Sequence, residues 1–242
     1  MMTPRNRPPR GLFITLEGTE GCGKSTQAKL LGEHLRNQGY DTVETREPGG
    51  TPLAEKIRSL LLDRADEPVA PETEAFLVLA ARRQHVAQVI EPALARGSIV
   101  LCDRFIDSTL AYQGYARGLD IATLERLNRL AAHALMPDLT LVFDLPVSTG
   151  LARRRSAAEL NRLDRESLRF HRSVRTGFLD LAKRHPTRIK VLSARASKET
   201  VARAVARVVT PMLGHIRRGV DHNRPAASRP SPQKSQARHA IR

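Results

Sequence analysis

The sequence predicts an α/β fold in which a parallel sheet of five strands lies between two layers of helices, a three-layer sandwich. Short apolar runs alternate with longer helical patterns along most of the chain. A glycine-rich segment follows the first apolar run directly, and charged side chains recur where later runs end. Because consecutive strands separated by helices pair in parallel through right-handed crossovers, the alternation indicates a single sheet covered on both faces.

The expected strands are apolar runs too short to cross a membrane, which takes about 18 residues or more. They are expected at 12–17, 41–46, 98–102, 139–145 and 188–194. Helices are expected at 24–37, 51–62, 71–95, 120–134, 165–185 and 197–212. The basic N-terminus leads into too few apolar residues for a signal peptide, and the two cysteines, Cys22 and Cys102, offer no disulfide framework. We therefore expect a cytoplasmic protein without a membrane partner.

The net charge of +15 is concentrated in three places, namely the first ten residues, an arginine cluster at 153–175, and the segment from 214 to the end. The remaining body is near neutral, which is unlike the spread basic face of a duplex-binding protein, so a nucleic-acid partner is not expected. The last segment is rich in Pro, Ser and Arg. These observations predict a basic extension at 1–11, one folded domain at 12–213 and a disordered basic tail at 214–242.

The segment GTEGCGKST matches the phosphate-binding pattern G-x-x-x-x-G-K-[ST], with a predicted strand before it and a predicted helix after it. Backbone N–H groups of such a loop surround phosphate oxygens, Lys24 can reach the β- and γ-phosphates, and the Ser25 hydroxyl can bind Mg²⁺. An ordinary glycine-rich turn is the alternative, but the strand and helix favour a P-loop NTPase fold. The predicted ATP-binding residues are Gly18, Thr19, Glu20, Gly21, Cys22, Gly23, Lys24, Ser25 and Thr26.

Asp103 and Arg104 directly follow the predicted strand at 98–102. Because ligands of parallel sheets bind beyond the carboxyl ends of the strands, this pair is expected beside the phosphate loop. Asp103 would then share Mg²⁺ with Ser25, and Arg104 would fork onto a phosphate. A surface ion pair is the alternative interpretation of an Asp-Arg dipeptide.

Several longer segments resemble those of bacterial thymidylate kinases. They include TREPGGTPLAEKIRSLLL, AARRQHV, DRFIDSTLAYQGYARGLD, PDLTLVFDL and ELNRLDRES, and they extend in unbroken order from residue 12 to about 212. The resemblance implies a nucleoside monophosphate kinase domain that transfers the γ-phosphate of ATP to dTMP. The products would be dTDP and ADP, in dTTP biosynthesis. It also implies dependence on Mg²⁺ and a homodimer.

The resemblance assigns an acceptor site to this chain. The acid in the phosphate loop, Glu20, would bind the 3′-hydroxyl of the acceptor sugar, and Tyr112 would exclude a ribose 2′-hydroxyl. Two arginines would hold the monophosphate, while an arginine and a glutamine would bind the thymine edge. The implied substrate-binding residues are Glu20, Glu47, Arg58, Val78, Arg82, Arg104, Thr109, Tyr112 and Gln113.

Some family members carry an arginine directly after the loop acid, whereas this chain has Gly21 there. The resemblance therefore implies that the stabilising cation comes from an Arg-rich lid at about 153–166, where a mobile arginine can contribute about 10³–10⁵ in rate. The implied catalytic residues are Lys24, Arg104, Arg154 and Arg162. The residues around Arg162 differ from the family's usual Asp-Arg-x-Glu, because Asn161 occupies the position of the Asp and Asp164 that of the Glu.

The aromatic residue that stacks on thymine in this family usually lies four residues before the arginine equivalent to Arg82, where this chain has Val78. Phe76 lies about 200° away from Val78 around a helix, so it faces elsewhere if the helix is regular. Two alternatives stay open: a shifted helix that lets Phe76 stack, or Phe105 filling the space.

Two other functions are compatible with the motifs. The chain could be another nucleoside or nucleoside monophosphate kinase on the same scaffold, which a substrate panel would reveal. It could instead be a nucleotide-binding regulator that binds nucleic acid through its basic tail, which would show steeply salt-dependent binding.

Overall fold

The computed structural model describes residues 11–63, 67–156 and 160–216. Within them five strands form one sheet, in which every pair of neighbours is parallel and the order is β2-β3-β1-β4-β5. The strands are β1 (Phe13–Glu17), β2 (Thr42–Arg46), β3 (Ile99–Asp103), β4 (Leu139–Asp144) and β5 (Ile189–Ser193). The predicted five-stranded parallel sheet is confirmed.

Burial follows the order of the strands. The central strands β1, β3 and β4 are buried along almost their whole length, whereas the edge strands β2 and β5 are largely half-exposed. Continuous apolar runs suit the centre of a parallel sheet because helices cover both of its faces. The carboxyl ends of all five strands therefore lie along one edge, where the phosphate loop leaves β1.

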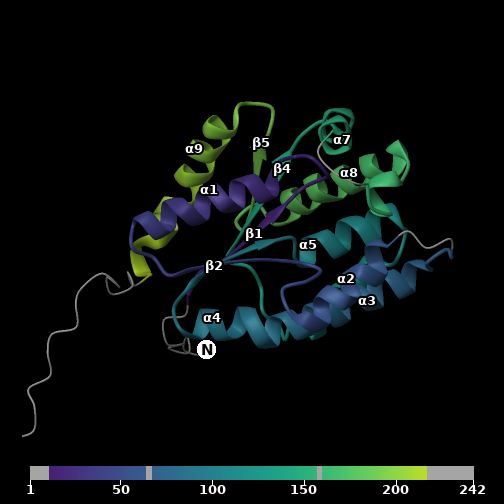
Figure 1. Cartoon of the computed structure of the whole chain (residues 1–242), viewed down its shortest axis with the longest axis horizontal. Helices are drawn as coiled ribbons and strands as arrows, with labels where there is room; N and C mark the ends of the chain where they lie inside the picture. The colour runs from purple at the N-terminus through teal and green to yellow at the C-terminus, as the bar shows by residue number, and fades with distance from the viewer. Residues whose placement is uncertain (1–10, 64–66, 157–159, 217–242) are drawn as a thin grey trace, which may run out of the picture.

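Helices cover both faces of the sheet (Figure 1). Helices α1 (Lys24–Asn37) and α9 (Lys198–Val209) pack on one face through a cluster that includes Leu31, Leu35 and Val205. The other face is covered by α3 (Pro71–His85), α4 (Glu91–Ala95), α5 (Ile106–Thr109) and α8 (Leu168–Arg184). This arrangement confirms the predicted three-layer sandwich.

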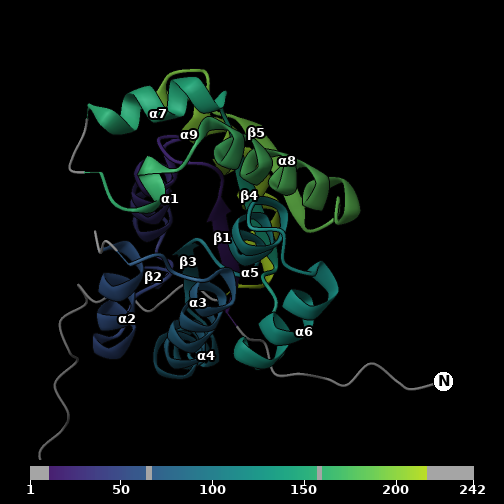
Figure 2. The same ribbon diagram turned by 90° about the vertical axis from the view of Figure 1, so that its right-hand side faces the viewer.

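The remaining helices flank these layers. They are α2 (Pro52–Leu62), α6 (Ile121–Ala131), α7 (Val147–Arg155) and the short 3₁₀ segments η3 (Leu163–Arg165) and η4 (Thr210–His215). Figure 2 shows α7 and α2 on opposite sides of the region where β1 leads into α1. These two helices therefore frame the carboxyl edge of the sheet from both sides.

Three stretches differ from the elements expected from sequence. The helix expected at 71–95 is α3 followed by a π-helical segment, η1 (Val86–Ile90), and then α4. Helix α5 and the π-helix η2 (Leu110–Ala116) form where no helix was expected, and so does α7. The π-helix has wider turns than the α-helix, so its apolar residues do not follow the period that marks an α-helix in a sequence.

Helix α1 begins without a side-chain cap, as α3 and α7 also do. The caps of α2, α6, α8 and α9 are Thr51, Asp120, Ser167 and Ser197, whose side chains accept a hydrogen bond from the first turn. The cap of α1 is Gly23, with φ at 95° and no side-chain hydrogen bond. The first N–H groups of α1 are therefore available to an anion, as a phosphate site requires.

The predicted extension at 1–11 lies outside the described residues except for Gly11, and most of the predicted tail at 214–242 lies outside them as well. The folded part continues slightly beyond the predicted boundary, since η4 runs to His215 and Ile216 packs into the core beside Leu213. Among the described residues, no helix is both long enough and apolar enough to span a membrane.

Candidate active site

Two cavities open at the carboxyl edge of the sheet and meet at the phosphate loop. The smaller cavity, of about 300 Å³, lies among α2, α3, the turn after β3 and η2. The larger one, of about 730 Å³, lies between the phosphate loop, α7 and the segment after β5. Four residues line both cavities, namely Gly21, Lys24, Ser25 and Arg154. A group bound in one cavity therefore meets a group bound in the other at these four residues.

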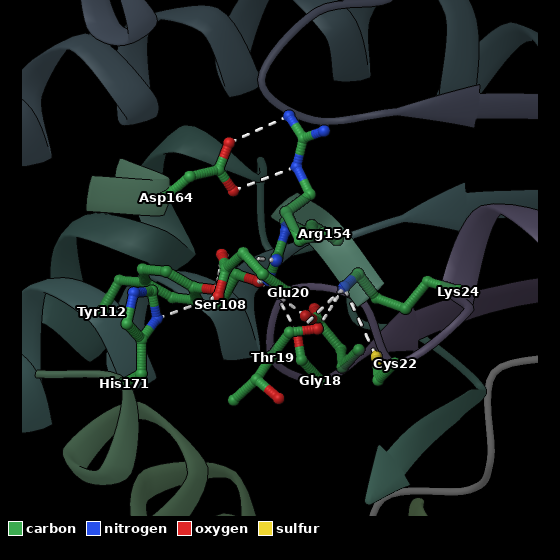
Figure 3. Close-up of polar contacts among 12 residues, drawn as sticks. Gly18, Thr19, Glu20, Cys22, Lys24, Ser108, Tyr112, Arg154, Asp164 and His171 are labelled. Atoms are coloured by element: carbon green, nitrogen blue, oxygen red, sulfur yellow. Dashed lines mark hydrogen bonds and ion pairs between the residues drawn. The ribbon is translucent and has the colours of Figure 1, made fainter. Parts of the chain in front are cut away.

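Lys24 is held inside the phosphate loop. Its ammonium donates hydrogen bonds to the carbonyl oxygens of Gly18 at 3.0 Å and Thr19 at 2.9 Å. It also lies 3.6 Å from the sulfur of Cys22, as the close-up shows (Figure 3). These contacts place the positive charge at the meeting point of the two cavities.

Ser25 and Asp103 are brought together although they are far apart in the sequence. The Ser25 hydroxyl donates to a carboxylate oxygen of Asp103 at 2.6 Å. This pair fits Mg²⁺, which takes few protein oxygens and completes its shell with water and phosphate. No cluster of three or more His, Cys, Asp or Glu side chains occurs within the described residues, so the part of the chain described offers no larger cage.

Glu20 points from the phosphate loop into the smaller cavity. Its Oε1 accepts hydrogen bonds from Arg104 at 3.2 Å and from the Tyr112 hydroxyl, and its Oε2 accepts one from Nδ1 of His171 at 3.1 Å (Figure 3). Burial opposes ionisation, but the hydrogen bond from His171 and the charges of Arg104 and Lys24 hold the pKa of Glu20 well below its usual range. The carboxylate is thus ionised and accepts hydrogen bonds only.

Arg104 follows β3 with a left-handed backbone, φ 74°. Its guanidinium donates to the carbonyl of Gly18 at 3.0 Å and to the Ser108 hydroxyl at 3.1 Å, and it lies 4.9 Å from the centre of the Tyr112 ring. Burial works against its charge, but Tyr112, Glu20 and other nearby groups raise the pKa of Arg104 above its usual range. Arg104 is therefore a fixed cation in the wall of the smaller cavity.

Glu17, at the end of β1, supports the turn that carries Arg104. Its carboxyl group binds the backbone N–H of Phe105 at 2.7 Å and the Ser108 hydroxyl at 2.6 Å. Burial, together with the charge of Asp107, raises the pKa of Glu17 from 4.5 to about 8. This acid is thus protonated at neutral pH and belongs to the support of the site.

Arg82 lines the smaller cavity and is 1 % exposed. Its Nε donates to Glu47 at 2.7 Å, and its Nη1 donates to Thr109 at 2.9 Å and to Asn128. These contacts use three of its five N–H donors. Glu47 and Thr109, which were both predicted to bind substrate, line the cavity and hold Arg82 in place.

The helix register around Arg82 is the regular one. Val78 lines the smaller cavity, while Phe76 is 60 % exposed and does not line it. Phe105 is fully buried, lines the cavity and lies under the guanidinium of Arg82 at 5.0 Å. The cavity thus has an apolar wall from Val78 and Phe105 where the resemblance implies a stacking aromatic.

The other predicted acceptor residues line the same cavity. Arg58, on α2, donates to the carbonyl of Pro48 at 2.9 Å. Burial, together with the charge of Arg46, lowers the pKa of Arg58 from its usual value. Gln113, on η2, donates from its amide nitrogen to Glu74 at 2.8 Å.

The described part of the predicted lid separates its arginines. Arg154 forms a two-pronged pair with Asp164, at 3.1 and 2.9 Å, and lines both cavities (Figure 3). Arg162 instead binds Glu74 at 2.6 Å and the carbonyl of Leu61 at 3.0 Å, and it lines neither of these cavities. Residues 157–159 of the predicted lid lie outside the described residues.

Comparison with known proteins identifies the family of this chain. The family model described as thymidylate kinase matches residues 16–205. The chain belongs to the thymidylate kinase family. A thymidylate kinase of Pseudomonas putida (strain W619) is 52 % identical over 206 residues, which cover 85 % of this chain and all of that protein. One from Thermomicrobium roseum is 55 % identical over 207 residues, covering 85 % and 98 % of the two chains.

A solved structure shows the same fold. The crystal structure of thymidylate kinase from Ehrlichia chaffeensis has a TM-score of 0.69 and 36 % sequence identity, covering 84 % of this chain and 99 % of that one. Family membership makes the chain a nucleotide kinase that phosphorylates dTMP to dTDP with ATP. The resemblance inferred from the motifs is confirmed.

Steric contact explains why the phosphate loop of this chain carries no arginine at residue 21. Gly21 has φ at 68°, and a Cβ at this position would lie 2.0 Å from the carbonyl oxygen of Gly150 in α7. Any side chain at residue 21 would therefore displace α7. The close contact places Arg153 and Arg154 of α7 in the same cavity wall as the phosphate loop.

Several residues of the site had no signal in the sequence. Glu74, Asn128 and His171 touch Gln113, Arg82 and Glu20 respectively, each from an element distant in sequence. A single acid, amide or imidazole inside a helical pattern looks like an ordinary surface or core residue. Only the folded chain brings these partners together.

Proposed function

We propose that the two cavities hold the two nucleotides of the thymidylate kinase reaction, with ATP in the larger and dTMP in the smaller. The supporting observation is that Gly21, Lys24, Ser25 and Arg154 line both. The γ-phosphoryl group would pass from donor to acceptor at this junction. In-line transfer requires the two substrates to approach from opposite sides of one phosphate, which two cavities meeting at a loop allow.

On the donor side, Lys24 and the uncapped N-terminus of α1 would bind the phosphates of ATP. Ser25 and Asp103 would hold Mg²⁺, which when bound neutralises charge on the phosphate oxygens. Arg154 lines both cavities, so as a lid cation it would stabilise the transferring group. Arg162, the other lid arginine predicted to be catalytic, contacts Glu74, and its catalytic role stays a prediction.

On the acceptor side, Arg58 and Arg104 would bind the phosphate of dTMP, and Glu20 would accept a hydrogen bond from the sugar 3′-hydroxyl. Tyr112, held against Glu20, would leave no space for a 2′-hydroxyl. The base would lie against the apolar wall of Val78 and Phe105, with its polar edge toward Arg82 and Gln113. Because these side chains are already anchored by protein contacts, little ordering is required when dTMP binds.

A coupled assay of ADP release tests this proposal. The chain should turn over with dTMP in preference to dCMP, UMP, GMP and thymidine, and turnover should require Mg²⁺. Lys24→Ala should lower kcat by about 10² or more without unfolding the protein, because a charge contact to the transferred phosphate is lost. Near-normal turnover of a folded Lys24→Ala protein, or a preference for another acceptor, would contradict the proposal.

A homodimer in the cytoplasm is part of the same proposal. Large apolar side chains are exposed on α2 and α3, namely Leu53, Leu60 and Phe76. Such side chains on neighbouring helices suit a subunit interface. Sedimentation of the full chain should show a dimer, and Phe76→Glu should shift it toward a monomer.

A further inference from the structure

Glu74 is a buried acid at the edge of the smaller cavity that the proposed mechanism does not use. It lies in the first turn of α3, is 1 % exposed and lines the cavity. Its Oε1 accepts hydrogen bonds from Gln113 at 2.8 Å and from Arg117 at 3.4 Å, and its Oε2 accepts from Arg117 at 3.1 Å and from Arg162 at 2.6 Å. Glu74 therefore links Gln113, which is proposed to contact the base, to two arginines.

The charge of Glu74 determines which end of the Gln113 amide it can bind. Burial opposes ionisation, but hydrogen bonds from Arg117, Arg162 and Gln113 lower the pKa of Glu74 below its usual value. An ionised carboxylate accepts hydrogen bonds and donates none, so only the NH₂ end of the amide can face it. The carbonyl end of Gln113 must then point the other way. The one side-chain hydrogen bond of Gln113 among the described residues uses its amide nitrogen, so the carbonyl oxygen stays available to a ligand in the cavity.

A fixed carbonyl acceptor discriminates between pyrimidines. Thymine presents an N3–H donor and an O4 acceptor, whereas cytosine presents an N3 lone pair and an N4 amino donor. An acceptor from Gln113 and donors from Arg82 match the thymine edge. The same groups would place a lone pair against the lone pair at N3 of cytosine, and donors against its amino group.

We propose that Glu74 is a positioning residue that sets the choice of thymine over cytosine by fixing the orientation of the Gln113 amide. Arg117 and Arg162 are the counter-charges that keep Glu74 a hydrogen-bond acceptor. The inference rests on the proposed placement of dTMP in the smaller cavity. It also gives Arg162 a role that agrees with its observed contact with Glu74.

The test is Glu74→Gln, measured as kcat/KM for dTMP, dUMP and dCMP with ATP saturating. The neutral amide can donate as well as accept, so Gln113 can present either end to the base. We expect the dTMP:dCMP ratio to fall about tenfold or more, the equivalent of about 1.4 kcal/mol. The dTMP:dUMP ratio should not change, because both bases carry the same N3–H and O4 groups. A generally damaged site would lower all three values together.

Glu166→Gln is the matched control. Glu166 binds Arg117 at 2.6 Å, and Glu74 binds the same arginine at 3.1 Å, but Glu166 has no contact with Gln113 among the described residues. This variant should keep both ratios at their wild-type values. If Glu74→Gln does not fold, Glu74→Asp keeps a charge but withdraws it from Gln113, and its dTMP:dCMP ratio should fall in the same direction.

An unchanged dTMP:dCMP ratio in a folded Glu74 variant would overturn the inference, and so would an equal change in Glu166→Gln. The wild type separates this failure from a failure of the proposed function. If the wild type and Glu74→Gln prefer dTMP over dCMP equally, only the role of Glu74 is contradicted. A wild-type protein that does not act on dTMP contradicts the placement of the substrate itself.

Discussion

Nδ1 of His171 lies 3.1 Å from Oε2 of Glu20, and the imidazole is fully buried. Because the Glu20 carboxylate is ionised and accepts hydrogen bonds only, Nδ1 must carry the proton of this contact. Nε2 of the same ring is buried without a partner among the described residues. The histidine thus has one polar contact, which fixes the oxygen of Glu20 that Arg104 and Tyr112 do not hold.

His171→Phe should therefore raise KM for dTMP about tenfold, with a smaller effect on kcat. The reason is the loss of a hydrogen bond to a charged group, which contributes about 1.5–3 kcal/mol. KM for ATP should stay near its wild-type value. His34→Phe, on the exposed side of α1, is the control. Equal values of KM for dTMP in wild type and His171→Phe would show that Glu20 does not need this support.

Arg154→Ala should lower kcat about 10²–10³-fold while changing KM for dTMP much less, because a cation at the junction acts mainly in the transition state. Arg155→Ala, one residue further along α7 and on neither cavity wall, is the control for general charge loss. If both variants lose the same factor in kcat, and if added salt reduces both losses, the arginines would instead act by nonspecific attraction of the charged substrates.

Arg162→Ala separates the two roles considered for this residue. A lower kcat with an unchanged dTMP:dCMP ratio would indicate direct contact with the transferring phosphate, as the family resemblance implies. A lower dTMP:dCMP ratio would indicate that Arg162 acts through Glu74, as the observed hydrogen bond at 2.6 Å favours. We expect the second outcome, measured with the same three pyrimidine substrates.

Gly150→Ala should destabilise the protein by about 1–3 kcal/mol and also lower kcat. The added Cβ would lie 2.4 Å from the carbonyl oxygen of Glu20, so α7 and its arginines must move away from the phosphate loop. Gly214→Ala is the matched control, since its Cβ would meet nothing within 4 Å. Urea unfolding and kcat measured on both variants would check this, and identical behaviour would refute it.

Val78→Phe should lower KM for dTMP, by up to about tenfold, because an aromatic face against the base adds about 1–3 kcal/mol. Phe76→Ala should leave KM for dTMP unchanged, since Phe76 does not line the smaller cavity. A higher KM in Val78→Phe would show that Phe105 already fills the space beside the base.

Glu17 gives the stability of the protein a specific pH dependence. Its pKa in the folded protein is about 8 against an ordinary 4.5, so the folded state binds one more proton than the unfolded state between these values. Stability from this group is therefore present at low pH and is lost as pH rises from about 4.5 to 8.

Glu17→Gln cannot ionise but can keep both hydrogen bonds. Its free energy of unfolding should rise relative to wild type by more than about 1 kcal/mol between pH 5 and pH 8, since one pKa unit corresponds to about 1.36 kcal/mol. Denaturant titrations of both proteins at several pH values would measure this difference. Parallel pH profiles would mean that Glu17 titrates normally.

The sequence by itself determined the layered fold and the phosphate site. Strands β1, β3 and β4 were predictable because a central parallel strand is buried on both faces and must be continuously apolar. The phosphate loop and the approach of Asp103 to Ser25 were predictable as well. The topology of parallel strands brings their carboxyl ends to one edge, whichever side chains fill the core.

The tertiary structure alone decided how the acceptor side is assembled. Gln113 and Glu74 come from η2 and α3, and Arg162 reaches Glu74 across 88 residues of sequence. Hydrophobic periodicity indicates which face of a segment is buried, but it does not indicate which polar side chain from another segment forms a hydrogen bond with that face. Hydrogen bonds between side chains depend on distances and angles that only the packed helices set. For that reason the supports of Arg82, Gln113 and Glu20 emerged only from the folded chain.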